Sequence, residues 1–309
     1  MPYILLTAGL AVLILSGNIL VTGSVQLARY FKMSSLVIGL TIVAFGTSAP
    51  ELFTSIGAAI EGASDIALGN VIGSNIANIG CILAIVALVC PIPIRNRAIG
   101  FDFLVLFSVT ILLFILAYND VIGLLEGIFL VTVLIVYTVW SIIKSKKNSN
   151  TSETANAAIK PFAALLMISA SVVGLYFSSG WFVRGAREIA LHWGVSERVI
   201  GVSIVAVGTS IPELTTSIIA AFRKEPDISV GNIIGSNIFN IVGVLGITAI
   251  IRPLHIVNHS IFIFDMIWVF GFSVVLLLTI LPLSKGTITR WEGGLLLLLY
   301  SVYMVIIFR

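Results

Sequence analysis

The chain is divided into ten apolar runs, each close to the length that a membrane-spanning helix requires. Such a helix needs about 20 mostly apolar residues to cross the hydrocarbon core of a bilayer. Only 10% of the residues are charged, against about 25% in soluble domains. We therefore expect an all-α membrane protein with ten transmembrane helices. The runs cover residues 3–22, 36–60, 67–90, 101–118, 121–143, 162–183, 199–222, 229–250, 261–281 and 291–308.

An internal repeat divides these runs into two halves. Residues 37–78 match residues 199–240 at a constant offset of 162, with 27 of 42 positions identical. The matches include Gly, Thr, Ser, Pro, Glu and Asn, which chance similarity between apolar helices does not produce. Each half holds five spans, and because five is odd, the second half must enter the membrane from the opposite side. We predict two inverted-topology repeats, a pattern that places transporter substrate sites at the repeat interface.

The basic residues predict how the halves are oriented. We place the first repeat at residues 1–143 and the second at 161–309, joined by a linker, 144–160, that is too short to form a domain. If both termini lie outside, 12 of the 17 Lys and Arg residues fall on the inner side. The positive-inside rule favours that arrangement. We expect a multi-pass protein of the cell membrane with a cytoplasmic linker.

Each repeat places one glutamate, Glu51 or Glu213, well inside a span. An ionisable residue at a helix centre costs about 2.5–3.5 kcal/mol on insertion scales. No Lys or Arg lies at a similar depth in the same spans. Each carboxyl group must therefore be protonated, accept hydrogen bonds or bind a cation. A protonated glutamate explains a single copy, but two copies in identical polar settings favour cation binding.

A proline precedes each glutamate and interrupts the helix. Pro50 has no N–H for the carbonyl of Gly46. Such a break at membrane depth is tolerated where the backbone is buried in protein or lines a cavity. Carbonyl, hydroxyl and carboxylate oxygens at helical spacing suit Na+ or Ca2+. A proline kink with local capping by Ser and Thr would explain one copy of the motif, but it would not explain why a glutamate follows the proline in both copies. The candidates are Ala44, Thr47, Ser48 and Glu51, repeated as Ala206, Thr209, Ser210 and Glu213.

The next span of each repeat carries a polar stripe. Its amides and hydroxyls can complete a coordination shell, or they can hydrogen-bond between helices. Glycines in the same spans have the GxxxG spacing that indicates close helix packing. The stripes are Asn70, Ser74, Asn75 and Asn78, and Asn232, Ser236, Asn237 and Asn240. We favour ligation for Ser74, Asn78, Ser236 and Asn240.

The motifs GTSAPE and GTSIPE, followed by GNVIGSN and GNIIGSN, resemble the two alpha-repeats of the sodium/calcium exchanger family. The resemblance implies alternating access, exchange of three Na+ for one Ca2+, and an ion site at the twelve positions favoured above. We expect no cofactor, no nucleic acid and no obligate protein partner. The short linker has no room for the regulatory insert of animal exchangers, so the chain resembles the prokaryotic form.

Residue differences from two groups of relatives limit which ions we expect the protein to transport. Potassium-dependent relatives carry Asp where this chain has Asn240, which argues against K+ co-transport. Proton-coupled calcium exchangers typically carry His after the glutamate, where this chain has Leu52 and Leu214. A proton/calcium or other cation antiporter on the same fold is the alternative. An intramembrane enzyme with Ser48 or Ser210 as its nucleophile would need a histidine base within the membrane, and none is placed there. A channel is also less favoured, because broken helices with a central pair of carboxylates fit a site that occludes ions better than an open pore.

Overall fold

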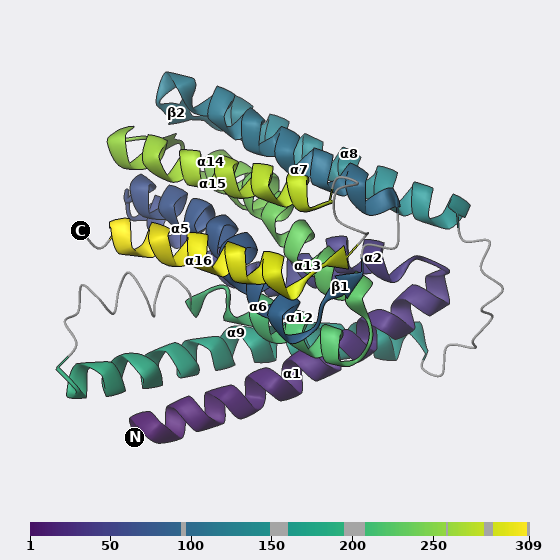
Figure 1. The fold of residues 1–309 in the computed structure, drawn as a ribbon. Coiled ribbons are helices and arrows are strands. Elements are labelled where there is room, and N and C mark those ends of the chain that lie inside the picture. Colours follow the sequence, from purple (N-terminus) through teal and green to yellow (C-terminus); the bar gives the residue numbers. More distant parts are fainter. Residues whose placement is uncertain (94–96, 149–159, 195–207, 258, 281–286, 308–309) are drawn as a thin grey trace.

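The computed structural model describes residues 1–93, 97–148, 160–194, 208–257, 259–280 and 287–307, which form a bundle of helices (Figure 1). In this part of the chain, seven helices are long and apolar enough to cross a membrane. An eighth span is the bent pair Ser35–Thr47 and Ala49–Ile60. The shorter apolar helices Ile211–Phe222 and Phe262–Leu278 fall within the two remaining predicted spans.

The first half follows the predicted order of spans. Its first, fourth and fifth spans are continuous helices, whereas its second and third are composite. The elements are α1 (Pro2–Phe31); α2 (Ser35–Ile38), η1 (Gly39–Val43), α3 (Ala44–Thr47) and α4 (Ala49–Ile60); α5 (Ser64–Ala77), η2 (Asn78–Leu83) and α6 (Ala84–Val89); α7 (Arg97–Leu116), followed by η3 (Ala117–Asn119); and α8 (Leu124–Asn148).

The second half repeats this order as far as it is described. Residues 195–207 lie outside the described residues, and with them the first part of the seventh predicted span and the candidate ligand Ala206. The elements are α9 (Pro161–His192); α12 (Ile211–Phe222); α13 (Pro226–Ile238), η5 (Phe239–Val244) and α14 (Leu245–Ile251); α15 (His259–Ile280); and α16 (Arg290–Ile307).

The second span is broken where proline predicted it. The helix segments before and after Ser48 differ in direction by 45°. Ser48 has φ −86° and ψ 10°, and Ser210 has φ −85° and ψ 5°. Pro50 and Pro212 then occupy the first turn of the following helix, where a missing N–H costs nothing. Ser48 and Ser210 therefore share the same non-helical backbone conformation, three residues before each glutamate.

The third span of each half contains a π-helical segment that no sequence signal predicted. η2 begins at Asn78, and η5 contains Asn240. Segments of this kind displace the regular hydrogen-bond ladder by one residue and are frequent at functional sites. The candidate asparagines thus lie where the backbone departs from α-helical geometry.

The two halves interlock at both ends of the bundle. Strand β1 (Ile92–Pro93) pairs antiparallel with β4 (Thr287–Ile288), and β2 (Val121–Ile122) pairs with β3 (Leu254–His255). Each two-stranded sheet therefore joins a connection of one half to a connection of the other. Helix α8 likewise packs against α14 of the second half, and α16 packs against α6 of the first.

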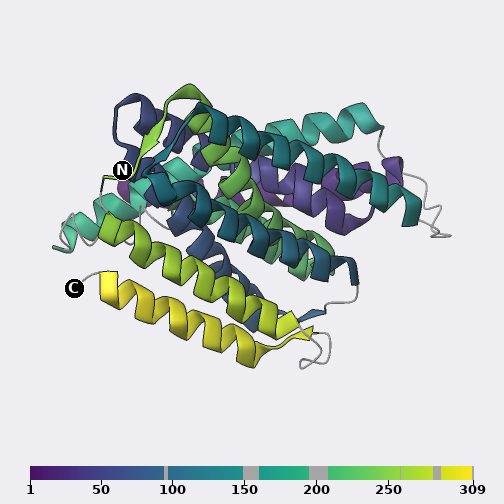
Figure 2. The same ribbon diagram turned by 90° about the horizontal axis from the view of Figure 1, so that it is seen from above.

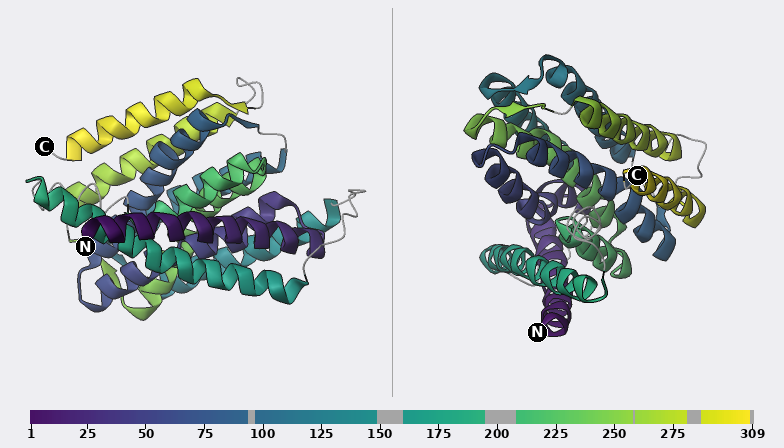
Figure 3. Two further views of the ribbon diagram at one scale, coloured as in Figure 1. Left: turned by 90° about the horizontal axis from the view of Figure 1, so that it is seen from below. Right: turned by 90° about the vertical axis from the view of Figure 1, so that its left-hand side faces the viewer.

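Two long helices, α1 and α9, form a pair at one side of the bundle (Figure 3). Their close contact depends on glycine, because a Cβ at Gly9 would lie 2.7 Å from the backbone nitrogen of Phe182. Both helices extend past the predicted runs, since a helix continues into the headgroup region where apolar composition ends. The start of α1 and the end of α16 lie at the same end of the molecule (Figures 1 and 2), as an even number of spans requires.

Candidate ion-binding site

The two glutamates lie at the starts of α4 and α12 and are fully buried. Each accepts a hydrogen bond from the serine of the opposite repeat. The Ser48 hydroxyl donates to Oε1 of Glu213 at 2.8 Å, and the Ser210 hydroxyl donates to Oε1 of Glu51 at 3.4 Å. The two motifs therefore form one site across the repeat interface.

Thr47 extends this cross-repeat network to the third span of the second half. Its hydroxyl donates to Oδ1 of Asn232 at 3.0 Å and lies 3.3 Å from the Ser236 hydroxyl. Ser236 in turn donates to Oε1 of Glu213 at 3.4 Å. The Thr47 hydroxyl also lies 3.3 Å from the carbonyl oxygen of Ala44 in its own helix. Several candidate ligands thus meet in one buried, oxygen-rich cluster.

Asn70 and Asn232 have equivalent structural contacts. The Asn70 amide donates to the Glu51 carbonyl oxygen at 3.1 Å and to the Ser55 hydroxyl at 2.9 Å. Asn232 donates to the Glu213 carbonyl at 3.3 Å and to the Ser217 hydroxyl at 2.9 Å. These bonds tie the second and third spans together behind each glutamate. Ser55 and Ser217 are not among the residues predicted for the site, although both lie within the repeat at the offset of 162.

Asn75 and Asn237 occupy equivalent positions where the third spans of the two halves meet. The Asn75 amide donates to the Asn237 carbonyl oxygen at 3.3 Å. The Asn237 amide donates to the carbonyl of Ile233 in its own helix at 2.7 Å. The first of these bonds connects the two halves close to Ser74 and Ser236, which are the chain neighbours of Asn75 and Asn237.

Several buried oxygens of the candidate residues have no hydrogen-bond partner within the described part of the chain. A buried polar atom without a partner carries a desolvation cost that a bound cation would remove. Carboxylate, hydroxyl and amide oxygens are the hard ligands that Na+ and Ca2+ prefer. The atoms are Oε2 of Glu51 and of Glu213, Oγ of Ser74, Oγ1 of Thr209, and Oδ1 of Asn78 and of Asn240.

The elements that carry the candidate asparagines pack against the helices that carry the glutamates of the opposite half. η2, which begins at Asn78, packs against α12, and η5 packs against α4. Ten of the candidates, all except Thr209 and Ala206, are at most 1% exposed. Thr209 is partly buried, and Ala206 lies outside the described residues.

Glycine allows the close approach of helices that the GxxxG spacing predicted in the second repeat. A Cβ at Gly231 would lie 2.6 Å from the carbonyl oxygen of Leu36, and one at Gly235 would lie 2.5 Å from that of Leu40. α13 is thereby held against η1 and α3, beside Thr47. Gly69 and Gly73 have no such contact with a described atom.

Two carboxylates supply the charge of the site. Among the described residues, no cluster of three or more His, Cys, Asp or Glu side chains could hold a metal ion. The remaining oxygens belong to neutral groups, and fewer charged ligands give weaker Ca2+ binding. Such a donor set suits an ion that must bind and then leave.

Comparison with known proteins identifies the family. The family model described as sodium/calcium exchanger protein matches residues 1–143 and 163–309. The chain belongs to the sodium/calcium exchanger family. It is thus a multi-pass membrane transporter and not an enzyme.

Relatives match over nearly the whole chain. The putative antiporter CaxA of Alkalimonas amylolytica is 36% identical over 99% of this chain and 98% of its own length. The sodium/calcium exchanger MaX1 of Methanosarcina acetivorans is 31% identical over 99% of this chain and 98% of its own. A structure of the sodium-calcium exchanger NCX_Mj soaked with 10 mM Na+ and zero Ca2+ superimposes with a TM-score of 0.85 and 32% identity, covering 98% of both chains. The fold is therefore the ten-span inverted-repeat fold of that exchanger.

Proposed function

We propose that this cation/calcium exchanger is an antiporter that exchanges Na+ for Ca2+ by alternating access. The ions bind between Glu51 and Glu213, with oxygens from the two motifs and from the third spans as further ligands. The observation that carries this proposal is the reciprocal pair of hydrogen bonds from Ser48 to Glu213 and from Ser210 to Glu51. Those bonds put both carboxylates in one buried site that is shared by the repeats.

The twelve residues predicted from the sequence form the proposed ligand set. Two carboxylates repel each other in a buried site unless positive charge lies between them. One Ca2+ balances two ionised glutamates, and three Na+ leave one positive charge in excess. Exchange at that ratio is therefore electrogenic. The residues are Ala44, Thr47, Ser48, Glu51, Ser74, Asn78, Ala206, Thr209, Ser210, Glu213, Ser236 and Asn240.

The test is uptake of labelled Ca2+ into proteoliposomes loaded with Na+, compared with K+-loaded and protonophore-treated vesicles. We expect uptake to require internal Na+ and to respond to an imposed membrane potential. Glu51→Gln and Glu213→Gln each remove one charge, and we expect each to lower uptake by at least about 100-fold, in line with the cost of leaving one member of a buried charged group uncompensated. Glu61→Gln is the matched control, because Glu61 is exposed at the end of the same helix as Glu51.

Other outcomes would assign a different coupling ion or mechanism. Uptake that follows a pH gradient and ignores Na+ would favour a proton/calcium antiporter on this fold. A rate and end-point independent of voltage would exclude the three-to-one ratio. Labelled Ca2+ that leaves the vesicles without any counter-ion would show a channel instead of an exchanger.

A further inference from the structure

Two aspartates lie within spans but outside the ion site, at equivalent places in the two halves. Asp102 belongs to α7 and Asp265 belongs to α15, the fourth span of each half. Asp102 is 4% exposed, and Asp265 is partly buried. An ionisable side chain within a span is costly and indicates a function. Neither aspartate is among the residues predicted for the ion site, so each needs a role of its own.

Each aspartate accepts a hydrogen bond from a tyrosine in the fifth span of its own half. The Tyr137 hydroxyl of α8 donates to Oδ1 of Asp102 at 2.9 Å, and the Tyr303 hydroxyl of α16 donates to Oδ1 of Asp265 at 3.2 Å. The aspartates are separated by 163 residues and the tyrosines by 166, close to the offset of 162 between the repeats. The same bond therefore recurs in both halves, outside the segments where their sequences match closely.

The fifth span of each half also packs directly on the third span of the other half. A Cβ at Gly127 of α8 would lie 2.8 Å from the carbonyl oxygen of Gly246 in α14, and one at Gly293 of α16 would lie 2.9 Å from that of Ala84 in α6. The bonded tyrosines lie ten residues further along each fifth span. Each fifth span is thus held at two points about 15 Å apart, given the helical rise per residue.

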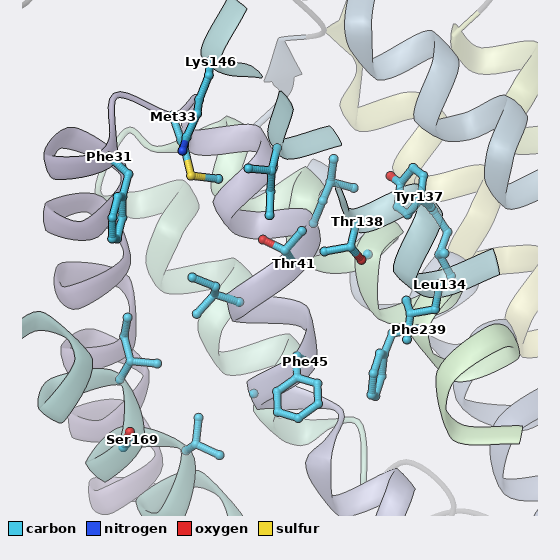
Figure 4. Close-up of a pocket in the computed structure, with 18 residues that line it drawn as sticks. Phe31, Met33, Thr41, Phe45, Leu134, Tyr137, Thr138, Lys146, Ser169 and Phe239 are labelled. Carbon is cyan, nitrogen blue, oxygen red and sulfur yellow. The ribbon is translucent and has the colours of Figure 1, made fainter. Parts of the chain in front are cut away.

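Between these two points, α8 contacts the π-helical segment η5 of the second half. Leu134 comes within 3.2 Å of the Cβ position of Gly243 in η5. In Figure 4, Leu134 extends from α8 towards Phe239, which directly precedes Asn240 in the chain. Tyr137 follows Leu134 by about one helical turn. Its bond to the fourth span therefore lies next to the contact of α8 with the ligand segment.

The contact between α16 and the π-helical segment η2 of the first half is equivalent. A Cβ at Gly80, two residues after Asn78, would lie 3.0 Å from Cβ of Tyr300 in α16 and 2.8 Å from Cζ of Phe272 in α15. The fourth and fifth spans of the second half thus both touch η2. The Tyr303 hydrogen bond joins these two spans one turn beyond Tyr300, so it affects how both pack on η2.

We propose that Asp102 and Asp265 are positioning residues, each holding the fifth span of its own half against the ion-ligand segment of the other half. By accepting the tyrosine hydrogen bond, Asp102 keeps α8 in contact with η5, and Asp265 keeps α16 in contact with η2. Because a hydrogen bond is directional, it fixes the rotation of the fifth span as well as its distance. The inference rests on the proposed function, since it takes Asn240 and Asn78 as ion ligands.

Ca2+ transport kinetics of Tyr137→Phe test the proposal. We expect its KM for Ca2+ to rise by about two- to tenfold, the factor equivalent to one net hydrogen bond, and kcat to change less, because a displaced ligand weakens binding. Asp102→Ala should behave in the same way. Asp102→Asn should keep the wild-type KM, since its amide oxygen still accepts the bond. Tyr118→Phe is the matched control, because the Tyr118 side chain is 85% exposed.

Hydrogen exchange measured by mass spectrometry gives a result that a general loss of stability would not produce. Tyr137→Phe should speed exchange of the backbone amides of residues 239–244 by about two- to tenfold and leave residues 78–83 as in the wild type. Tyr303→Phe should do the reverse. Each variant therefore acts on the segment of the opposite half, whereas a general loss of stability would affect both segments.

Three outcomes would overturn the proposal. They are an unchanged KM in folded Tyr137→Phe, unchanged exchange in the opposite half's segment, and an Asp102→Asn variant that behaves like Asp102→Ala, since charge would then matter instead of the hydrogen bond. Tyr303→Phe provides the same test in the other half if Tyr137→Phe does not fold. Hydrogen exchange is measured without Na+ or Ca2+, so a wild type whose uptake ignores Na+ would overturn the proposed function and not this result.

Discussion

Asparagines in the third spans have different surroundings although they share one sequence pattern. Asn70 and Asn232 each donate two hydrogen bonds that connect the second and third spans. Asn78 and Asn240 are equally buried, but neither amide has a hydrogen-bond partner among the described residues. We therefore assign a structural role to the first pair and propose ion ligation for the second.

Alanine substitution separates these two roles. Asn70→Ala removes both amide bonds, so we expect its free energy of unfolding to fall by about 1–2 kcal/mol, given the usual strength of hydrogen bonds between membrane helices. Asn78→Ala should lose less stability and instead raise the ion concentrations needed for half-maximal transport. Thermal unfolding and ion titration of the two variants measure both quantities. Equal destabilisation, with wild-type ion dependence in Asn78→Ala, would assign Asn78 a structural role as well.

At the scale of elements, the third span of the second half is positioned by direct contact between its backbone and the backbone of the second span of the first half. α13 lies so close to η1 and α3 that a Cβ at Gly235 would be 2.5 Å from the Leu40 carbonyl oxygen. The opposing atom belongs to the backbone and cannot move aside as a side chain can. Gly235 directly precedes Ser236, so this contact also sets the distance between Ser236 and Thr47.

We expect Gly235→Ala to separate these helices and to lower the free energy of unfolding by about 1–3 kcal/mol, the usual cost of overpacking. Ca2+ transport should fall in the protein that remains folded. Gly57→Ala in α4 is the control, since no described atom lies within 4 Å of its Cβ position and alanine favours the helix by up to about 1 kcal/mol. Thermal unfolding of both variants in detergent gives the comparison. Identical stability of Gly235→Ala and wild type would mean that the helices adjust freely.

At the scale of the whole molecule, outer helices and connections of each repeat pack against the other repeat. α8 packs on α14, α16 packs on α6, and the two short sheets join the halves at opposite ends. The apolar core around the third spans is therefore built by both halves, whereas α1 and α9 belong to a second, smaller core. Each end of the bundle has a distinct set of connections, so its orientation in the membrane can be tested.

Cysteine labelling tests the orientation predicted from the basic residues. In a chain with Cys81 and Cys90 replaced by alanine, Tyr118→Cys and Lys32→Cys place thiols at opposite ends of the bundle. Both native side chains are exposed, Tyr118 by 85%. We expect a membrane-impermeant maleimide to label Tyr118→Cys in intact cells, and Lys32→Cys only after the cells are opened. The reverse pattern would place both termini in the cytoplasm.

The sequence by itself determined the ten spans, the inverted repeat, the break before each glutamate and the candidate ligands. These features follow from local chemistry: apolar length, proline's missing N–H, and polar residues that recur at one offset. Only the tertiary structure decided that Ser48 binds the opposite glutamate and that Asn70 supports the backbone behind Glu51. It alone also decided that π-helical segments carry Asn78 and Asn240 and that the halves interlock. Hydrogen-bond partners and helix packing depend on residues far apart in the chain, and a repeat pattern does not specify which of them meet.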